Sequence, residues 1–220
     1  MVGKQRARRD EDKQARRRHI LDETLLLWNE QTFAALTMAK VAERCALAKG
    51  TLYLYFATKE ELLLVLLEEL LTEWFDALDA ALDTADQPWD AARVARTIGL
   101  VTAERTALTR LLAIGEGILE YNITEARARA YKGMMLARAG ATGARLERRL
   151  PFLAAGEGLL ILIRVHALAT GLRQMADPAP IVREVLASPE LWPLRVEFGP
   201  ALTETLIALV LGMERERSRR

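Results

Sequence analysis

The sequence predicts an all-α protein, and both its composition and the spacing of its hydrophobic residues favour that fold class. Hydrophobic residues make up 51% of the 220 positions, enough for a sizeable core, while glycine and proline contribute only 13 and 7 residues. Leucine, alanine, glutamate and arginine, which are good helix formers, fill most windows of the chain, and alternating β-branched stretches are scarce. A helical fold therefore accounts for this chain better than a fold built on a sheet.

Charge is unevenly distributed along the chain, although the formal net charge is only +1. The first 60 residues carry twelve Lys or Arg against eight Asp or Glu, and the first nineteen carry eight basic and three acidic residues. A basic front end of this kind suits binding to a polyanion, although a solvated charged tail has the same composition. We expect residues 1–18 to form a basic, flexible tail.

Two short helices joined by a short turn are predicted behind a first helix. The first helix begins near residue 19, and its apolar residues recur at helical spacing to about residue 28. Residues 36–45 form a second helix with Thr37 as its N-cap, and residues 49–56 form a third helix of barely two turns. Only three residues separate the second and third helices, which is the spacing of a helix-turn-helix motif.

A long helix is predicted to begin at the capping box of Thr58 and Glu61. Its apolar residues continue almost to the Asp-Gln-Pro break at 86–88, so no flexible linker follows the helix-turn-helix. We place the domain boundary inside this helix, with a helix-turn-helix domain over 19–62 and a second domain over 63–220. Further helices are predicted at 89–102, 104–120, 124–148, 155–176 and 200–215.

The stretch from about residue 18 to residue 65 closely resembles the DNA-binding signature of the TetR family of transcriptional repressors. The resemblance rests on three motifs in this order and spacing: Val41-Ala42-Glu43-Arg44, Lys49-Gly50-Thr51-Leu52-Tyr53-Leu54-Tyr55-Phe56 and Thr58-Lys59-Glu60-Glu61-Leu62. It implies a dimeric, cytoplasmic regulator that binds a palindromic operator on double-stranded DNA and is released by a small-molecule effector. The C-terminal helical bundle would then bind the ligand and form the dimer.

The resemblance also implies which side chains contact DNA. The readers of base edges in the major groove would be Met38, Lys49, Gly50, Thr51 and Leu54, and the contacts to the sugar-phosphate backbone would be Thr37, Tyr53, Tyr55 and Lys59. Lys49 is suited to guanine O6 and N7, and the Thr51 methyl group to a thymine methyl group. Tyrosine and lysine donors suit phosphate oxygens, which position a protein without reading sequence.

The turn departs from the family's usual Ala-Gly-Val-Ser, because here it is Cys45-Ala46-Leu47-Ala48. Ala46 is strained if the turn requires a positive φ. Ala48 lacks the hydroxyl that would cap the third helix, a loss of about 1 kcal/mol. These changes leave open a second hypothesis, that the chain is a helical ligand- or protein-binding adaptor with a weakened DNA-binding head.

The C-terminal domain is expected to contain a dimer interface and a ligand pocket. The interface candidates form stripes on the last two long helices, which would equally suit an intramolecular core: Leu160, Ala167, Gly171, Leu202, Leu206, Leu209 and Met213. The pocket candidates are aromatic, sulfur-containing or ionisable residues: Trp89, Glu116, Tyr121, Met134, Met135, Arg164, His166 and Arg173. Glu116 would suit a cationic ligand, and Arg164 with Arg173 an anionic one.

Neither an enzyme, nor a metal or cofactor site, nor a membrane protein is expected. The chain has two histidines and one cysteine, without an HExxH, a CxxC or a glycine-rich phosphate loop. The lone Cys45 excludes an internal disulfide and fits the reducing cytoplasm. The most apolar stretch, residues 159–172, contains Arg164 and His166 and is too short to cross a bilayer.

Overall fold

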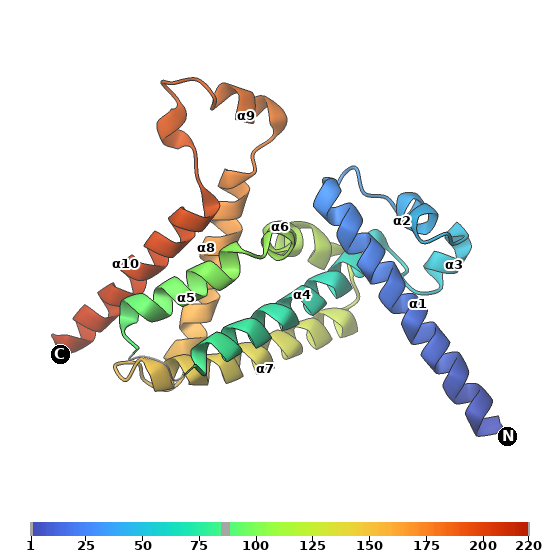
Figure 1. The fold of residues 1–220 in the computed structure, drawn as a ribbon, viewed down its shortest axis with the longest axis horizontal. Helices are drawn as coiled ribbons and strands as arrows, with labels where there is room; N and C mark the ends of the chain where they lie inside the picture. Colours follow the sequence, from blue (N-terminus) through green and yellow to red (C-terminus); the bar gives the residue numbers. More distant parts are fainter. Residues whose placement is uncertain (1, 85–88, 220) are drawn as a thin grey trace. The chain divides into compact units, whose positions relative to one another are not determined.

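The computed structural model describes residues 2–84 and 89–219, with side chains from Asp10 onward, and these ranges contain helices and no β-strand. The chain divides into two compact units (Figure 1). The first unit extends to Glu69 and includes residues 115–124, and the second unit comprises residues 70–114 and the chain from Glu125 onward. The all-α prediction is confirmed. The division falls inside the long helix α4 (Lys59–Leu82), between Glu69 and Leu70.

The first unit begins with α1 (Val2–Glu30), followed by α2 (Met38–Arg44) and α3 (Lys49–Tyr53). The expectation of a flexible tail over 1–18 is wrong for the described residues, because α1 already begins at Val2. Its first part is rich in lysine, arginine, glutamine and alanine, so helix formation propagates outward from the buried part of α1. Helix α3 ends at Tyr53 rather than at Phe56, since the next amide, that of Leu54, bonds to the Thr51 carbonyl in a tighter turn.

Helix α4 is buried all round from Leu62 to Leu67, just after its first turn. Every residue from Leu62 to Leu67 is buried, and a helix that is apolar all round must be covered on every side. Part of this cover within the first unit is the segment 115–124, in which Leu119 is fully buried and the Gly115 Cα faces the Leu67 side chain.

That covering segment corrects one predicted helix. Residues 104–120 were expected to form a single helix, but α6 (Thr106–Ile114) gives way to a π-helical turn, Gly115–Leu119, and then to a 3-10 turn, Glu120–Asn122. The break coincides with Gly115 and Gly117, which weaken a regular helix because glycine has the largest backbone entropy to lose.

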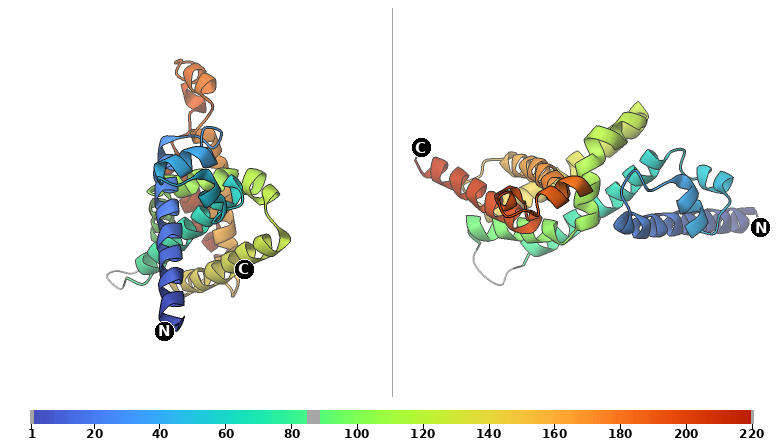
Figure 2. Two further views of the ribbon diagram at one scale, coloured as in Figure 1. Left: turned by 90° about the vertical axis from the view of Figure 1, so that its right-hand side faces the viewer. Right: turned by 90° about the horizontal axis from the view of Figure 1, so that it is seen from above.

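The second unit is a bundle of α5 (Ala91–Ala103), α6, α7 (Glu125–Arg149), α8 (Glu157–Ala176) and α10 (Phe198–Ser218). Helix α10 packs along α5, and α8 packs against α6, α7 and α10 (Figures 1 and 2). Two of these contacts are so close that they require glycine. A Cβ at Gly99 would lie 2.5 Å from the Thr203 Oγ1, and a Cβ at Gly158 would lie 2.1 Å from the Gly143 carbonyl oxygen.

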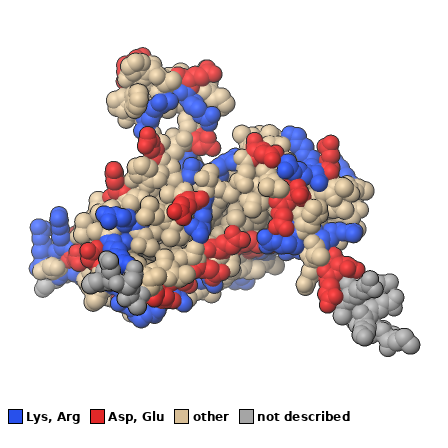
Figure 3. Space-filling view, in the orientation of Figure 1, with Lys and Arg blue, Asp and Glu red and all other residues tan. Residues whose placement is uncertain are grey.

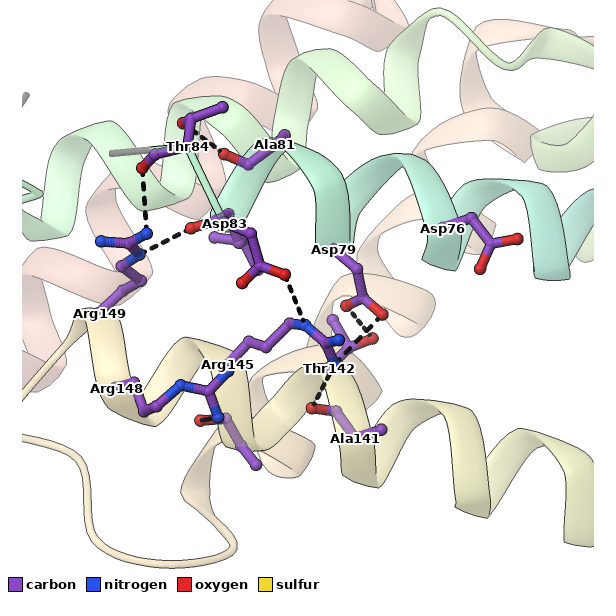
Figure 4. A network of polar contacts seen from close by, with 12 residues as sticks. Asp76, Asp79, Ala81, Asp83, Thr84, Ala141, Thr142, Arg145, Arg148 and Arg149 are labelled. Atoms are coloured by element: carbon purple, nitrogen blue, oxygen red, sulfur yellow. Dashed lines mark hydrogen bonds and ion pairs between the residues drawn. The ribbon is translucent and has the colours of Figure 1, made fainter. Parts of the chain in front are cut away.

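A charged seam joins the second half of α4 to α7 (Figure 4). Asp79 accepts a hydrogen bond of 2.7 Å from the Thr142 hydroxyl and lies 3.4 Å from the Arg145 guanidinium, which also contacts Asp83 at 3.3 Å. One turn further on, Arg149 donates to two backbone carbonyls at the end of α4, at 2.7 and 3.0 Å. The Asp79 side chain is only 16% exposed, so water screens this seam less than an ordinary surface ion pair.

An excursion without a predicted counterpart connects α8 to α10. It contains the short helix α9 (Pro180–Val185) and a 3-10 turn, Trp192–Leu194. Apolar side chains on this excursion are exposed to solvent within the protomer: Ile181, Val182, Val185, Trp192 and Leu194.

The close approach of α7 and α8 predicts that Gly158→Ala strongly destabilises the second unit. The new methyl group would collide with backbone atoms of Gly143, which cannot rotate away, so we expect a loss of about 3 kcal/mol in the free energy of unfolding. Denaturant unfolding at a fixed protein concentration measures the change. Gly133→Ala on α7 is the matched control, because nothing lies within 4 Å of its Cβ position, and it should stabilise by about 0.5–1 kcal/mol. Equal unfolding free energies for the two variants would contradict the close-packing argument.

Candidate nucleic-acid interface

The turn between α2 and α3 is held by backbone hydrogen bonds and contains a strained residue. The Ala46 amide bonds to the Glu43 carbonyl at 3.0 Å, and the Leu47 amide bonds to the Ala42 carbonyl at 2.8 Å. Ala46 has a φ of +52°, so the turn does require the left-handed region, in which a side chain is unfavourable. The expected strain at Ala46 is therefore confirmed.

The caps of the two short helices differ in quality. The Thr37 hydroxyl accepts a hydrogen bond of 3.3 Å from the Lys40 amide and caps α2, as predicted. Ala48 stands at the N-cap of α3 and provides no side-chain hydrogen bond. At the start of α4 the Thr58 hydroxyl accepts from the Glu61 amide at 3.0 Å, while the Glu61 carboxylate accepts from the Ala57 amide at 2.9 Å. The predicted capping box thus forms, except that the Glu61 carboxylate accepts from the amide of Ala57 instead of the amide of Thr58.

Helix α2 is fixed on α1 by a bridging arginine. The Arg44 guanidinium contacts Glu23 at 2.9 Å and Glu30 at 3.1 Å, so one side chain of α2 joins two carboxylates of α1. These hydrogen bonds raise the pKa of Arg44 above its usual value. Beneath the turn, burial raises the pKa of the Cys45 thiol, which keeps this cysteine neutral and part of the core.

The inner and outer faces of the helix-turn-helix are clearly separated. Val41, Ala42, Leu52 and Phe56 are buried, which confirms that these positions pack the short helices into the core of the first unit. The outer face is formed by four predicted DNA-contacting residues that are exposed in the structure: Lys49, Gly50, Tyr53 and Leu54. Leu54 is 80% exposed, although it is a large apolar residue. This face therefore presents a lysine, a tyrosine and a leucine side chain together to solvent.

Four other predicted DNA contacts lie beside this face. Thr37 is exposed at the N-terminus of α2, and Thr51 and Tyr55 are half-buried. The Lys59 ammonium donates to the Phe33 carbonyl at 2.9 Å and lies 3.7 Å from the centre of the Phe33 ring. It therefore ties the start of α4 to the segment between α1 and α2, a structural role that the sequence did not reveal.

One predicted base reader is misplaced. Met38 is only 7% exposed and forms part of the hydrophobic core, so its side chain is not available to a base edge. Helical spacing explains the error, because Met38 shares a face of α2 with the buried Val41 and Ala42.

The predicted pocket residues are divided between the two units. Glu116 and Tyr121 belong to the first unit, and Tyr121 is 82% exposed. In the second unit, the Trp89 ring is contacted by the Arg93 and Arg149 guanidinium groups, which are 4.3 and 5.1 Å from its centre. The other predicted pocket residues of that unit are Met134, Met135, Arg164, His166 and Arg173, all of them half-buried or exposed.

Two arginines among these residues have identifiable surroundings. Arg173 donates to the Thr109 hydroxyl at 2.9 Å and stacks on Phe198 at 3.7 Å, and burial lowers its pKa from the usual value. Arg164 lines a cavity of about 170 Å³ together with Phe152, Leu153, Glu157, Met213, Glu216 and Arg217.

A larger cavity, of about 490 Å³, lies at the base of the α9 excursion and contains none of the predicted pocket residues. Its lining combines apolar with charged side chains: Leu172, Trp192, Arg195, Val196, Glu197, Pro200, Ala201 and Glu204. This volume falls in the range typical of small-molecule sites.

The two predicted dimer stripes differ in their exposure. On α8, Leu160, Ala167 and Gly171 are exposed, and Ile163 and Met175 extend this apolar stripe. On α10, however, Leu202 and Leu206 are completely buried in the core of their own protomer, so their prediction as interface residues is wrong. The accessible side of α10 bears Ala208 and Gly212, which are exposed, with Leu209 and Met213 half-buried beside them.

Helix α8 is the one described helix that is long and apolar enough to cross a membrane. Only 22% of its most apolar window is buried, so much of its apolar surface faces outward in the single protomer. Because Arg164 and His166 interrupt this stretch, an interface with another protein helix fits the exposed stripe better than lipid does.

The geometry described so far defines a helix-turn-helix protein with an exposed contact face and a separate helical unit. Residues 20–66 match the family described as "Bacterial regulatory proteins, tetR family", and residues 68–217 match the family described as "Tetracyclin repressor-like, C-terminal domain". The chain therefore belongs to the TetR family of transcriptional regulators, which confirms the resemblance found in the sequence. This membership places it among DNA-binding transcriptional regulators.

Individual relatives agree with this assignment over parts of the chain. The HTH-type transcriptional repressor KstR of Mycolicibacterium smegmatis is 40% identical over 75 residues, which cover 34% of this chain and 35% of the repressor. The fold resembles the fatty acid degradation regulator FadR from Bacillus halodurans, with a TM-score of 0.55 and 16% identity over 88% of this chain and 97% of FadR. A Shewanella sp. PV-4 protein assigned to the tetR family gives a TM-score of 0.52 and 18% identity over 89% and 95% of the two chains. At such low identity these two structures support the fold alone.

The positive φ at Ala46 predicts that Ala46→Gly stabilises the helix-turn-helix. Relief of left-handed strain, about 1–2 kcal/mol, exceeds the extra backbone entropy that glycine loses, about 0.4–1 kcal/mol. We expect a net gain of about 0.5–1 kcal/mol, measured by denaturant unfolding. Ala39→Gly is the matched control, because Ala39 is exposed inside α2, where glycine costs about 0.5–1 kcal/mol. A loss of stability in both variants would contradict the strain.

Proposed function

We propose that this protein is a cytoplasmic, effector-responsive repressor that binds a palindromic DNA operator as a homodimer. The single observation that carries the proposal is the outer face of α3, where Lys49, Tyr53 and Leu54 are exposed while Leu52 and Phe56 anchor the helix from within. Membership of the TetR family supports the same reading of this face. Three exposed side chains on and directly after a short helix that is anchored from within suit insertion into the major groove.

Within this proposal the contacts divide into two kinds. Lys49 donates to guanine O6 and N7, Gly50 allows the backbone to approach closely, and the methyl groups of Thr51 and Leu54 contact thymine. Thr37, Tyr53 and Tyr55 donate to phosphates, because hydroxyl donors at the edge of the recognition face meet the rim of the groove. Lys59 retains two N–H bonds besides the one to Phe33, so any phosphate contact that it makes is secondary to its structural role.

Replacement of Lys49 provides the direct test of base reading. A DNA duplex selected by the wild-type chain from a random-sequence library serves as the operator, and fluorescence anisotropy measures affinity for it and for single-base variants. Lys49→Ala should lose about 1–3 kcal/mol of discrimination at one base pair of each half-site. Lys132→Ala, which removes an exposed charge of the second unit, should leave discrimination unchanged.

Failure of the wild-type chain to select any sequence would overturn the repressor proposal. The helical adaptor, which the uncapped α3 and the strained Ala46 keep as the second candidate, would then be the better account.

We propose that the homodimer forms through α8 and α10. The apolar stripe of Leu160, Ile163, Ala167, Gly171 and Met175 supports α8 as one half of the interface, and Ala208 and Gly212 allow close approach along α10. A two-fold axis through these helices pairs each stripe with its copy, so one surface serves both protomers.

Ala167→Glu should dissociate this dimer. Burying two new carboxylates at the interface costs about 3 kcal/mol or more, which raises the dimer dissociation constant roughly a hundredfold. Light scattering over a range of protein concentrations measures the change, and operator affinity should fall with it because a monomer reads only one half-site. Ala130→Glu, at an exposed position of α7, is the matched control. A variant that remains dimeric at the wild-type dissociation constant would exclude this face.

The effector acts, in this proposal, by shifting a population of conformations. Helix α4 belongs to both units without an interruption, so a ligand that favours one conformation of the second unit biases the separation of the DNA-binding faces. The half-sites lie about one duplex turn apart, or a multiple of it. If the separation of the two DNA-binding faces changes slightly, only one face can bind its half-site. The cavity of about 490 Å³ is the candidate effector site, and its Arg195, Glu197 and Glu204 suit a ligand with both apolar and polar groups.

A further inference from the structure

The first part of α1 lies outside the hydrophobic core. Among the side chains of α1 that the structure describes, those from Asp10 to His19 are all exposed, and Ile20 is the first that is buried. Helix α1 begins at Val2, so 18 residues precede Ile20, which corresponds to about 27 Å of helix at about 1.5 Å per residue. We call residues 2–19 the α1 extension. Figures 1 and 2 show it running on beyond α3.

The inward face of α1 changes its chemistry where the helix leaves the core. Ile20, Thr24 and Leu27 follow at intervals of four and three residues, and all three are buried against the rest of the first unit. The same face continues outward as Arg16 and Arg17, four and three residues before Ile20, and then as Lys13. An apolar stripe that packs on protein thus becomes a basic stripe that is exposed.

This basic stripe begins beside the helix that we propose to read DNA. The Arg17 guanidinium lies 5.3 Å from the centre of the Phe56 ring, and Phe56 closes the segment that carries Tyr53, Leu54 and Tyr55. Arg18, on another side of α1, is instead paired with Asp22 and Glu69 at 2.9 and 3.1 Å. Arg18 is therefore held in ion pairs on another side of α1, while the Arg17 guanidinium lies by the ring that closes the recognition segment.

The charge of the extension matches a polyanion. Residues 2–19 hold eight Lys or Arg and three Asp or Glu, and the segment 2–9 contains four basic and no acidic residues. The three acidic residues, Asp10, Glu11 and Asp12, are consecutive and so point in three directions around the helix. Asp10, three residues before Lys13, continues the face of Lys13, Arg16 and Arg17, whereas Glu11 lies on the opposite side. Figure 3 shows both acidic and basic side chains on this end of the first unit, in the face that the view presents.

We infer that the α1 extension binds the phosphate backbone of the DNA that flanks each half-site, through Lys13, Arg16 and Arg17. The inference rests on the proposed operator binding and adds a second contact region to it. A helix of about 27 Å spans roughly eight base pairs at about 3.4 Å per step, so the extension reaches beyond the bases that α3 reads. Phosphate contacts of this kind raise affinity for all sequences alike and make it dependent on salt.

The test compares two duplexes that carry the same selected operator, one ending at its edges and one extended by ten base pairs on each side. Affinities of the full-length wild-type chain and of K13A/R16A/R17A are measured over a range of salt concentrations. Alanine keeps the helical propensity of the extension, and circular dichroism checks that the helix persists. The control is R129A/K132A/R148A, which removes three exposed charges from α7 in the second unit.

The wild-type chain should bind the extended duplex more tightly than the short one. K13A/R16A/R17A should lose this advantage and at least tenfold in affinity at low salt, and its slope of log affinity against log salt should become shallower by about 2 to 3. Its discrimination between bases should not change, and the control should behave as wild type.

Three results would overturn the inference. If K13A/R16A/R17A keeps the wild-type affinity and slope while Lys49→Ala still loses discrimination, the extension makes no DNA contact and the repressor proposal stands. An equal loss of affinity on both duplexes would exclude the flanking location. If the wild-type chain binds neither duplex above a scrambled sequence, the proposed function fails and the inference fails with it.

Discussion

The arrangement of the first unit depends on the burial of Leu62 to Leu67 on every side of α4. No single neighbouring helix can shield six consecutive residues, because their side chains point in all directions around the axis. The short helices of the recognition motif cannot supply all of this cover, and residues 115–124, which come from a distant part of the sequence, contribute to it. The second half of the same helix is instead fastened to α7 by the Asp79–Arg145 seam. Helix α4 thus contributes to the apolar core of the first unit and to the charged contact with α7 in the second. One continuous helix therefore connects the DNA-binding unit to the ligand-binding unit.

Much of the fold was predictable because its determinants are local. The capping box at Thr58, the N-cap at Thr37 and the three-residue turn are encoded within a few positions of one another, and each forms in the structure. Errors arose where a boundary depends on packing rather than on pattern. Residues 2–19 are charged and rich in good helix formers, a composition that suits either a coil or a helix. They form a helix because they continue the part of α1 that is anchored by the buried Ile20. The π-helical turn at Gly115 also depends on packing, because the segment that contains it covers part of α4.

The candidate site was predictable in its outline and less so in its individual side chains. Helical periodicity identifies an apolar face but does not say whether the chain itself or a second copy covers it, which is why Leu202 and Leu206 were assigned to a dimer face although they are core residues. Met38 was misassigned for a similar reason, since a flexible apolar side chain suits both a base edge and a core. The bond from Lys59 to the Phe33 carbonyl joins residues 26 positions apart, and no local signal reveals it. Ligand-lining residues depend on how several helices meet, so a list drawn from residue type alone was scattered over both units.

The uncapped, strained start of α3 has a consequence for the dynamics of the protein. Left-handed strain at Ala46 and the missing cap at Ala48 together cost about 2 kcal/mol, and both penalties vanish when the recognition helix opens. Local opening is therefore roughly thirtyfold more frequent than in a motif with glycine and serine at these positions, and the amides of α3 exchange with solvent correspondingly faster than those of α4. Operator DNA binds the closed form of this ensemble, so part of the binding free energy is used to order the recognition helix α3.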